Sequence, residues 1–408
     1  MNIKYIDKGV CAAKGFTANG VHCGIRKNKN KRDLALILSE KEAAAAAVYT
    51  SNLVKGAPIT VTKNNIENGY ARAVLCNSGN ANTCNQDGIL KAEEMCVLAA
   101  SSCGIDAKDV VVASTGVIGV PLDTAPIKNA LPELYAGLTS GAEGSRNAAE
   151  AIMTTDTKVK EVAVSFEING VTCKMGGIAK GSGMIHPNLA TMLIFITSDA
   201  AILPEMLQKA LKNDVQTTFN MISVDGDTST NDMVSVLANG MAGNDIISEE
   251  GEAFDIFCEA LHRITVRLCK MLAADGEGAT KLLECSVRGA KDLETAKVTA
   301  KSVICSSLVK AAMFGSDANW GRVLCAIGYS GADVDVDKID VSFTSSKGTI
   351  DVCKDGRGVP FSEELAKEIL SENEITINVS LNDGAFEATA WGCDLTYDYV
   401  KINGDYRT

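Results

Sequence analysis

The sequence is poor in the residues that build metal sites. It contains only 3 histidines, and its 14 cysteines are scattered from Cys11 to Cys393 without a Cys-x-x-Cys pair. Structural zinc sites take their ligands from closely spaced cysteines and histidines, so we expect no metal site. The cysteines are then mostly buried free thiols, as is usual in proteins that are not secreted.

Positive charge and long apolar runs are also missing. The chain has 39 Lys and Arg against 51 Asp and Glu, a formal charge of −12. Nucleic acids and anionic membranes bind to concentrated basic surfaces, so this balance argues against both but permits small charged metabolites. No apolar run approaches the roughly 18 to 20 residues of a membrane span, and the first residues lack a signal-peptide core. We expect a cytoplasmic protein.

The remaining composition is that of an ordinary globular protein. With 408 residues, of which 46% are hydrophobic and 22% charged, the chain can form two or three domains. A strand at 71–76, a polar loop at 77–88 and a helix at 89–102 follow one another as in α/β proteins. The pattern restarts after Lys281, which predicts a first domain of 1–282 and a smaller α/β domain of 283–408.

One local signal points to a helix near the N-terminus. Ser39-Glu-Lys-Glu42 has the spacing of a capping box, and the run Ala43–Ala47 follows it directly. Alanine is the best helix former, so we predict that a helix starts here.

The most informative stretch is the junction at 180–199. A Gly-, Pro- and Asn-rich turn runs into an apolar segment at 191–197 that has no helical periodicity, which predicts a strand buried on both faces with Thr191 first. A threonine hydroxyl becomes a nucleophile when a base stands beside it, and a cut before Thr191 would supply its own α-amine as that base. The alternative is an ordinary strand threonine, because glycine-rich turns often precede strands.

Four other segments carry weaker signals. The Asn-rich loop 77–88 either presents amides to a polar substrate or simply tolerates turn geometry. Thr115-Gly116 ends a predicted strand, where a backbone amide and a hydroxyl can face a developing oxyanion. Glu277 lies between two glycines, accessible enough to meet a substrate ammonium. The acidic loop 226–232 departs from the calcium-loop pattern and is interpreted as a turn.

Taken together and in order, these segments resemble the ornithine acetyltransferase family of arginine biosynthesis, also called glutamate N-acetyltransferases. The resemblance covers the whole chain and rests on seven motifs that follow one another in family order. They begin at Asn77 (NSGNAN), Ser114 (STGVIG), Met153 (MTTD), Lys180 (KGSGMIHPNLATML), Val224 (VDGDTSTND), Asp275 (DGEGATK) and Asp317 (DANWGR). One departure is Leu189, where the family often has methionine.

The resemblance implies a layered α/β/β/α sandwich with a second, smaller α/β domain. It also implies self-cleavage between Ala190 and Thr191 into chains of 1–190 and 191–408, with Thr191 as the new N-terminal nucleophile. Thr115 and Gly116 would form the oxyanion hole. The substrate-binding positions that it implies are Thr154, Lys180, Thr191, Glu277, Asn403 and Thr408, and Thr155 is an alternative to Thr154.

The activity implied is transfer of acetyl from N-acetylornithine to glutamate through an acetyl-Thr191 intermediate. Lys180 and Glu277 are the complementary charges for a substrate with a carboxylate and an ammonium. The resemblance implies no cofactor, and assembly from two copies of each cleaved chain. The residues leave open whether acetyl-CoA is a second donor. Two rival interpretations also stay open: an N-terminal-threonine aminopeptidase or amidohydrolase, and an uncleaved metabolite-binding protein.

Overall fold

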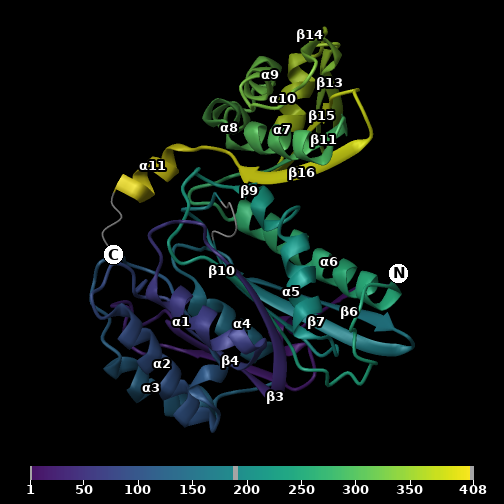
Figure 1. Ribbon diagram of the computed structural model, residues 1–408. Coiled ribbons are helices and arrows are strands. Elements are labelled where there is room, and N and C mark those ends of the chain that lie inside the picture. Colours follow the sequence, from purple (N-terminus) through teal and green to yellow (C-terminus); the bar gives the residue numbers. More distant parts are fainter. Residues whose placement is uncertain (1, 187–191, 405–408) are drawn as a thin grey trace.

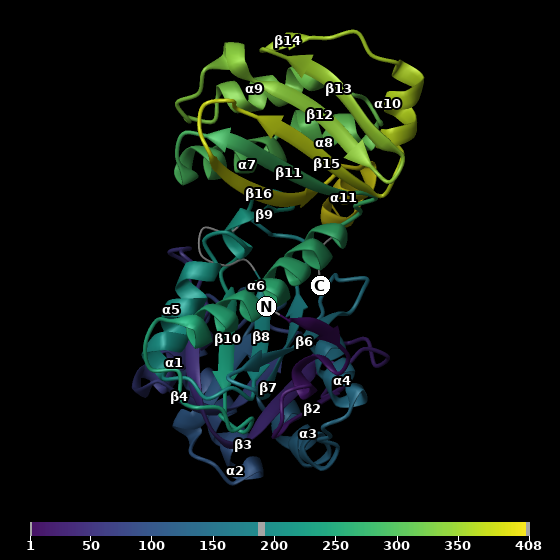
Figure 2. The same cartoon turned by 90° about the vertical axis from the view of Figure 1, so that its right-hand side faces the viewer.

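Two β-sheets organise the chain, one in each of two lobes (Figure 1). The structure is a computed structural model and describes residues 2–186 and 192–404. The larger lobe holds the N-terminal part of the chain, and the long helix α6 (Glu252–Ala274) rises from it toward the smaller lobe (Figure 2).

In the described parts of the chain, the larger sheet has nine strands in the order β1-β6-β7-β8-β10-β3-β4-β5, with β2 paired to β3. The long strand β3 pairs with β2 along its first half and with β10 along its second half. It therefore joins one half of the sheet, which holds β4 and β5, to the other half, which holds β10, β8, β7, β6 and β1. The strands are β1 (Lys4–Ile6), β2 (Phe16–Val21), β3 (Leu34–Tyr49), β4 (Tyr70–Asn77), β5 (Val110–Ser114), β6 (Lys160–Ile168), β7 (Val171–Lys180), β8 (Leu193–Ser198) and β10 (Met233–Ala238).

Three apolar clusters define the layers of the larger lobe. One joins the two halves of the sheet and includes Phe195 of β8 and Val111 of β5. A second, with Met95, packs α2 and α3 against β4 and β5, and a third, with Leu268, packs α5 and α6 against the other half. The order is therefore helix, sheet, sheet, helix, and the predicted fold class is confirmed. The helices of this lobe besides α6 are α1 (Ala57–Asn65), α2 (Gly88–Cys103), α3 (Ala125–Ala136), α4 (Ala142–Ile152) and α5 (Pro204–Asp214).

Among residues 2–186 and 192–404, the smaller lobe holds a seven-stranded sheet in the order β14-β13-β12-β15-β11-β16-β9. Helix α7 contacts β11 and β16. The strand β9, which precedes α6 in the chain, pairs with β16 and thereby ties the two lobes together. The predicted domain boundary at 282–283 stays a prediction. The elements are β9 (Ile222–Ser223), β11 (Leu282–Ala290), β12 (Asp340–Ser345), β13 (Gly348–Lys354), β14 (Arg357–Gly358), β15 (Glu374–Ser380), β16 (Phe386–Cys393), α7 (Leu293–Cys305), α8 (Ser307–Phe314), α9 (Trp320–Gly328) and α10 (Glu363–Leu370).

The predicted helix at the alanine run is wrong, because residues 39–47 lie inside strand β3. Alternate alanines face different clusters: Ala44 and Ala46 pack in one, and Ala43 and Ala45 in the other. A strand enclosed by apolar layers on both faces favours small side chains, so packing overrides the local helix signal.

The predicted buried strand after the central turn is confirmed as β8, whose six residues are all buried. The last helix, α11 (Tyr397–Gly404), leaves the smaller lobe and returns to the larger one (Figure 1). Within the described ranges, no helix is long and apolar enough to cross a membrane.

Candidate active site

Six of the residues predicted for the site line one cavity of about 530 Å³. They are Thr115, Gly116, Thr154, Lys180, Glu277 and Asn403. Both Thr154 and Thr155 line the cavity, so the choice between them stays a prediction. Ala190, Thr191 and Thr408 lie outside the described residues. Met192 and Leu193, which follow Thr191 in the chain, are part of the cavity wall.

The end of β5 presents two hydrogen-bond donors to this cavity. The N–H of Thr115 donates to the carbonyl of Asn77, 2.9 Å away, which holds the turn. Neither the Thr115 hydroxyl nor the Gly116 N–H donates to another described residue. Gly116 has φ +127°, and a Cβ there would lie 2.6 Å from the carbonyl carbon of Gly79. Only glycine therefore fits this turn.

The Asn-rich loop beside it is held by its own side chains. The Oδ1 of Asn77 accepts from the N–H groups of Gly79 and Asn80 at 3.2 and 3.1 Å. Its Nδ2 donates to Ser114 Oγ at 2.7 Å. These contacts favour the turn interpretation of this loop over direct substrate contact.

A residue that sequence reasoning missed ties this loop to the predicted oxyanion hole. The buried Asn231 donates from Nδ2 to the carbonyls of Ala81, at 2.6 Å, and Ser114, at 2.9 Å. Its Oδ1 accepts from the hydroxyls of Thr83 and Thr230, both at 2.6 Å. All of its amide capacity is thus used to position the cavity wall. The interpretation of 226–232 as a simple turn hid this role.

Lys180 supplies a buried cation at the end of β7. Its side chain donates no hydrogen bond to another described residue. Burial lowers its pKa from the ordinary value, and the nearby Lys160 acts in the same direction, while Asp156 opposes both. An anionic substrate group would relieve the cost of keeping this ammonium charged.

Behind Lys180 lies a buried network that sequence reasoning did not foresee. The ammonium of Lys160, which is 1% exposed, donates to Asp156 Oδ1 at 2.7 Å and to Asp275 Oδ2 at 2.6 Å. Asp156 also accepts from the N–H groups of Thr154, at 2.9 Å, and Gly181, at 2.7 Å. The carboxylate of Asp156 therefore holds two segments of the predicted site, one at Thr154 and one at Lys180–Gly181.

Burial alone would raise the pKa of Asp156. The charges of Lys180 and Lys160 and the Gly181 N–H outweigh burial, so the pKa lies below its usual range. Asp156 is therefore ionised at neutral pH, and its charge favours the cationic form of Lys180.

Glu277 faces the cavity but is 9% exposed, so the expected accessible carboxylate is wrong. It is enclosed because the chain packs closely around it: its N–H donates to the Ser182 carbonyl at 2.9 Å. A Cβ on Gly183 would lie 2.5 Å from its carboxylate. Asn403 of α11 donates from Nδ2 to Glu277 Oε2 at 2.8 Å, which brings the C-terminal helix to the cavity.

Asp225 binds both helix α11 and the turn that precedes the predicted cleavage point. Its carboxylate accepts from the N–H groups of Met184 and Ile185, at 2.7 and 2.9 Å, and from the Tyr399 hydroxyl at 3.2 Å. The described part of the tail therefore reaches the site, as substrate binding by the tail requires.

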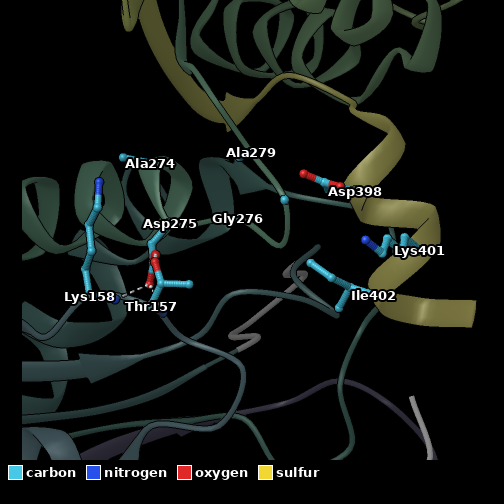
Figure 3. Close-up of a pocket in the computed structure, with 10 residues that line it drawn as sticks. Thr157, Lys158, Ala274, Asp275, Gly276, Ala279, Asp398, Lys401 and Ile402 are labelled. Carbon is cyan, nitrogen blue, oxygen red and sulfur yellow. Dashed lines mark hydrogen bonds between the residues drawn. The ribbon is translucent and has the colours of Figure 1, made fainter. Parts of the chain in front are cut away.

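The structure holds a second cavity, of about 480 Å³ (Figure 3). Its charged lining residues include Asp275, Asp398 and Lys401, and the Thr157 hydroxyl donates to Asp275 there. None of the residues predicted for the site lines it. We therefore take the first cavity as the candidate active site. In the described ranges, no cluster of His, Cys, Asp or Glu could hold a metal ion.

The fold and this cavity define the class of protein. An α/β/β/α sandwich carries two free donors at a strand end, a buried cation and a buried carboxylate around one cavity. This set suits acyl transfer between small charged molecules, in which an oxyanion develops beside a charged substrate.

Comparison with known proteins identifies the family. The ArgJ family model matches residues 17–408, and the chain belongs to this family. The arginine biosynthesis bifunctional protein ArgJ of Caldanaerobacter subterraneus subsp. tengcongensis is 51% identical over 408 residues, which is 100% of both chains. The protein of the same name from Bacillus subtilis is 47% identical, covering 98% of this chain and 96% of its own.

A solved structure is also similar. The crystal structure of the arginine biosynthesis bifunctional protein argJ from Bacillus halodurans is 46% identical, with a TM-score of 0.50. The match covers 52% of this chain and 98% of that chain. The ornithine acetyltransferase family expected from the seven motifs is confirmed, and this chain is an enzyme of that family.

Proposed function

We propose that this enzyme moves the acetyl group of N-acetylornithine to glutamate through an ester on Thr191. The observation that carries the proposal is the cavity in which six predicted residues meet, although they come from segments up to 288 positions apart (Thr115 to Asn403). The family, and the ArgJ relatives that are named for arginine biosynthesis, support it.

We further propose that the chain cuts itself between Ala190 and Thr191. The backbone is held on both sides of residues 187–191. Upstream, the N–H of Ile185 donates to Asp225, and downstream, strand β8 pairs with β10. Met184, just upstream, has φ +56°, which is strained for a residue with a side chain. The Bacillus halodurans chain, which matches about half of this one, has the length expected of a cleaved product.

The proposed first half-reaction uses the α-amine of Thr191. At neutral pH a part of it is uncharged and accepts the hydroxyl proton as the oxygen attacks the acetyl carbonyl. The oxyanion receives hydrogen bonds from the Thr115 hydroxyl and the Gly116 N–H, which have no other described partner. The tetrahedral intermediate then collapses. The departing ornithine nitrogen takes the proton from the α-ammonium of Thr191, and ornithine leaves.

In the second half-reaction the amine of glutamate attacks the acetyl ester, and N-acetylglutamate leaves with Thr191 restored. Both substrates carry an α-carboxylate, and the charge complementary to it is Lys180, while the charge complementary to the side-chain ammonium of ornithine is Glu277 of the same cavity. The enclosure of Glu277 beneath Asn403 supports exclusion of water, which would otherwise hydrolyse the ester.

Four finer points are proposed with this activity. Acetyl-CoA can load the same threonine, in keeping with relatives named bifunctional. No cofactor takes part. Two copies of each cleaved chain assemble, and the enzyme works in the cytoplasm. The acetyl-CoA step is tested by incubating the enzyme with acetyl-CoA and glutamate and measuring N-acetylglutamate.

The test of the main proposal measures N-acetylglutamate and free acetate after the enzyme meets N-acetylornithine and glutamate. We expect N-acetylglutamate in excess, and neither product with Thr191→Ala. Free acetate as the main product would indicate a hydrolase instead. Formation of neither product by the wild-type protein would indicate a binding protein.

A further inference from the structure

One carboxyl group of the cavity has no role in the scheme above. Asp232 immediately precedes strand β10, is 3% exposed and forms part of the cavity wall. Its Oδ2 has no hydrogen-bond partner among the described residues. Buried polar atoms are nearly always paired, so an unpaired carboxyl oxygen in the wall of a substrate cavity indicates a functional demand.

The backbone around Asp232 is held firmly. Its carbonyl accepts from the N–H of Thr50 at 3.0 Å, and the next residue, Met233, donates its N–H to the Met192 carbonyl at 2.9 Å. Met192 directly follows Thr191 in the chain, so Asp232 lies at the start of the strand that pairs with β8, the strand that follows the predicted nucleophile. These bonds fix the backbone that carries Asp232 at the cavity wall.

The titratable groups around it come from three other elements. Lys180 of β7 and Glu277 of the loop after α6 line the same cavity, and Tyr49 of β3 is paired with the neighbouring Met233. Burial raises the pKa of Asp232 well above its ordinary value, against a hydrogen bond from Ser229 and the charge of Lys180. Burial therefore favours the protonated form of this carboxyl.

The proposed function, on which this inference rests, leaves one proton unassigned. Free glutamate carries an α-ammonium, which must lose a proton before its nitrogen lone pair can attack. Ornithine, in turn, is expelled as a neutral amine and departs as an ammonium. The α-amine of Thr191 handles only the hydroxyl proton, so each half-reaction needs a second site that gives or takes one proton.

We propose that Asp232 is this second site and carries one proton between the two amines. In the first half-reaction the Asp232 carboxyl gives its proton to the departing ornithine nitrogen and becomes a carboxylate. In the second, this carboxylate takes a proton from the incoming ammonium. The freed lone pair attacks the acetyl carbon, and the C–O bond to Thr191 breaks. One of the two N–H protons passes through the α-amine to the threonine oxygen, and the other stays on the amide nitrogen of the product.

The test compares two acetyl acceptors in Asp232→Asn. Glutamate must lose a proton before it attacks, whereas hydroxylamine is largely neutral at pH 7 and does not need a base. We expect about a 100-fold loss of transfer to glutamate, the effect of losing a general base, with transfer to hydroxylamine unchanged. The loss should shrink as the pH rises toward the pKa of the glutamate amine.

Two further variants complete the design. Asp227→Asn makes the same chemical change at an exposed carboxylate of the same loop and should transfer to both acceptors like the wild type. Asp232→Glu keeps the carboxyl and should restore most of the glutamate transfer, even if asparagine disturbs folding. Equal loss with both acceptors, loss that does not ease at high pH, or full activity of Asp232→Asn overturns the inference. A wild-type enzyme that acetylates neither acceptor overturns the proposed function itself.

Discussion

Gly183→Ala tests whether Glu277 acts from the position in which the structure places it. A Cβ at residue 183 would lie 2.5 Å from the Glu277 carboxylate, whereas ordinary contact begins near 3.4 Å. The carboxylate would have to move by the difference, about 0.9 Å, and the Oε2 that accepts the hydrogen bond from Asn403 is one of the atoms in the clash. A displacement of about 1 Å in a catalytic site can cost about 100-fold in rate.

We expect kcat/KM for N-acetylornithine to fall about 10- to 100-fold, the loss of one charge-assisted hydrogen bond. The melting temperature should stay near that of the wild type, because the clash involves only the end of a flexible side chain. Gly328→Ala, at a glycine with no atom within 4 Å of the added Cβ, is the matched control. Unchanged kcat/KM in Gly183→Ala, or an equal loss in the control, would refute the placement of Glu277.

Three other changes give distinct outcomes. Lys160→Met leaves two buried carboxylates without their cation and should destabilise the protein by about 3 to 5 kcal/mol in urea unfolding; wild-type stability would contradict the network. Deleting 403–408 should abolish transfer while the melting temperature holds, and a truncated enzyme at the full rate would disprove the role of the tail. The hydrogen bond that the His262 Nδ1–H donates to Asp214 raises the pKa of His262, so the stability that this pair contributes is complete below the ordinary pKa of about 6.5 and is lost as pH rises through the raised value. The melting temperatures of wild type and His262→Gln should therefore converge toward alkaline pH, and a constant difference would count against this pair.

The buried strands were predictable because they carry their own signal. An unbroken apolar run is a property of neighbouring residues, and strand β8 lies where this run predicts it. The alanine run at 43–47 has an equally local signal for a helix, but its outcome depends on what covers it. Apolar layers on both faces of β3 come from segments far along the chain, so no local pattern reports them.

The candidate site was predictable only through the resemblance to a family. The hydrogen bond between Glu277 and Asn403 joins residues 126 positions apart, and no periodicity links them. Asp156 and Asp232 escaped notice for a related reason. Each stands in a polar segment where an acidic residue is ordinary, and its importance appears only when burial removes the solvent around it. Composition cannot foresee burial of a single carboxylate.

The central claim, an acetyl group carried on Thr191, is tested most directly by intact mass measurement of the denatured enzyme after mixing with N-acetylornithine alone. The account predicts two chains, of 190 and 218 residues, with one acetyl group on the chain that begins at Thr191. Addition of glutamate should remove that acetyl group. A single uncut chain of 408 residues, or two chains without added mass, would contradict it.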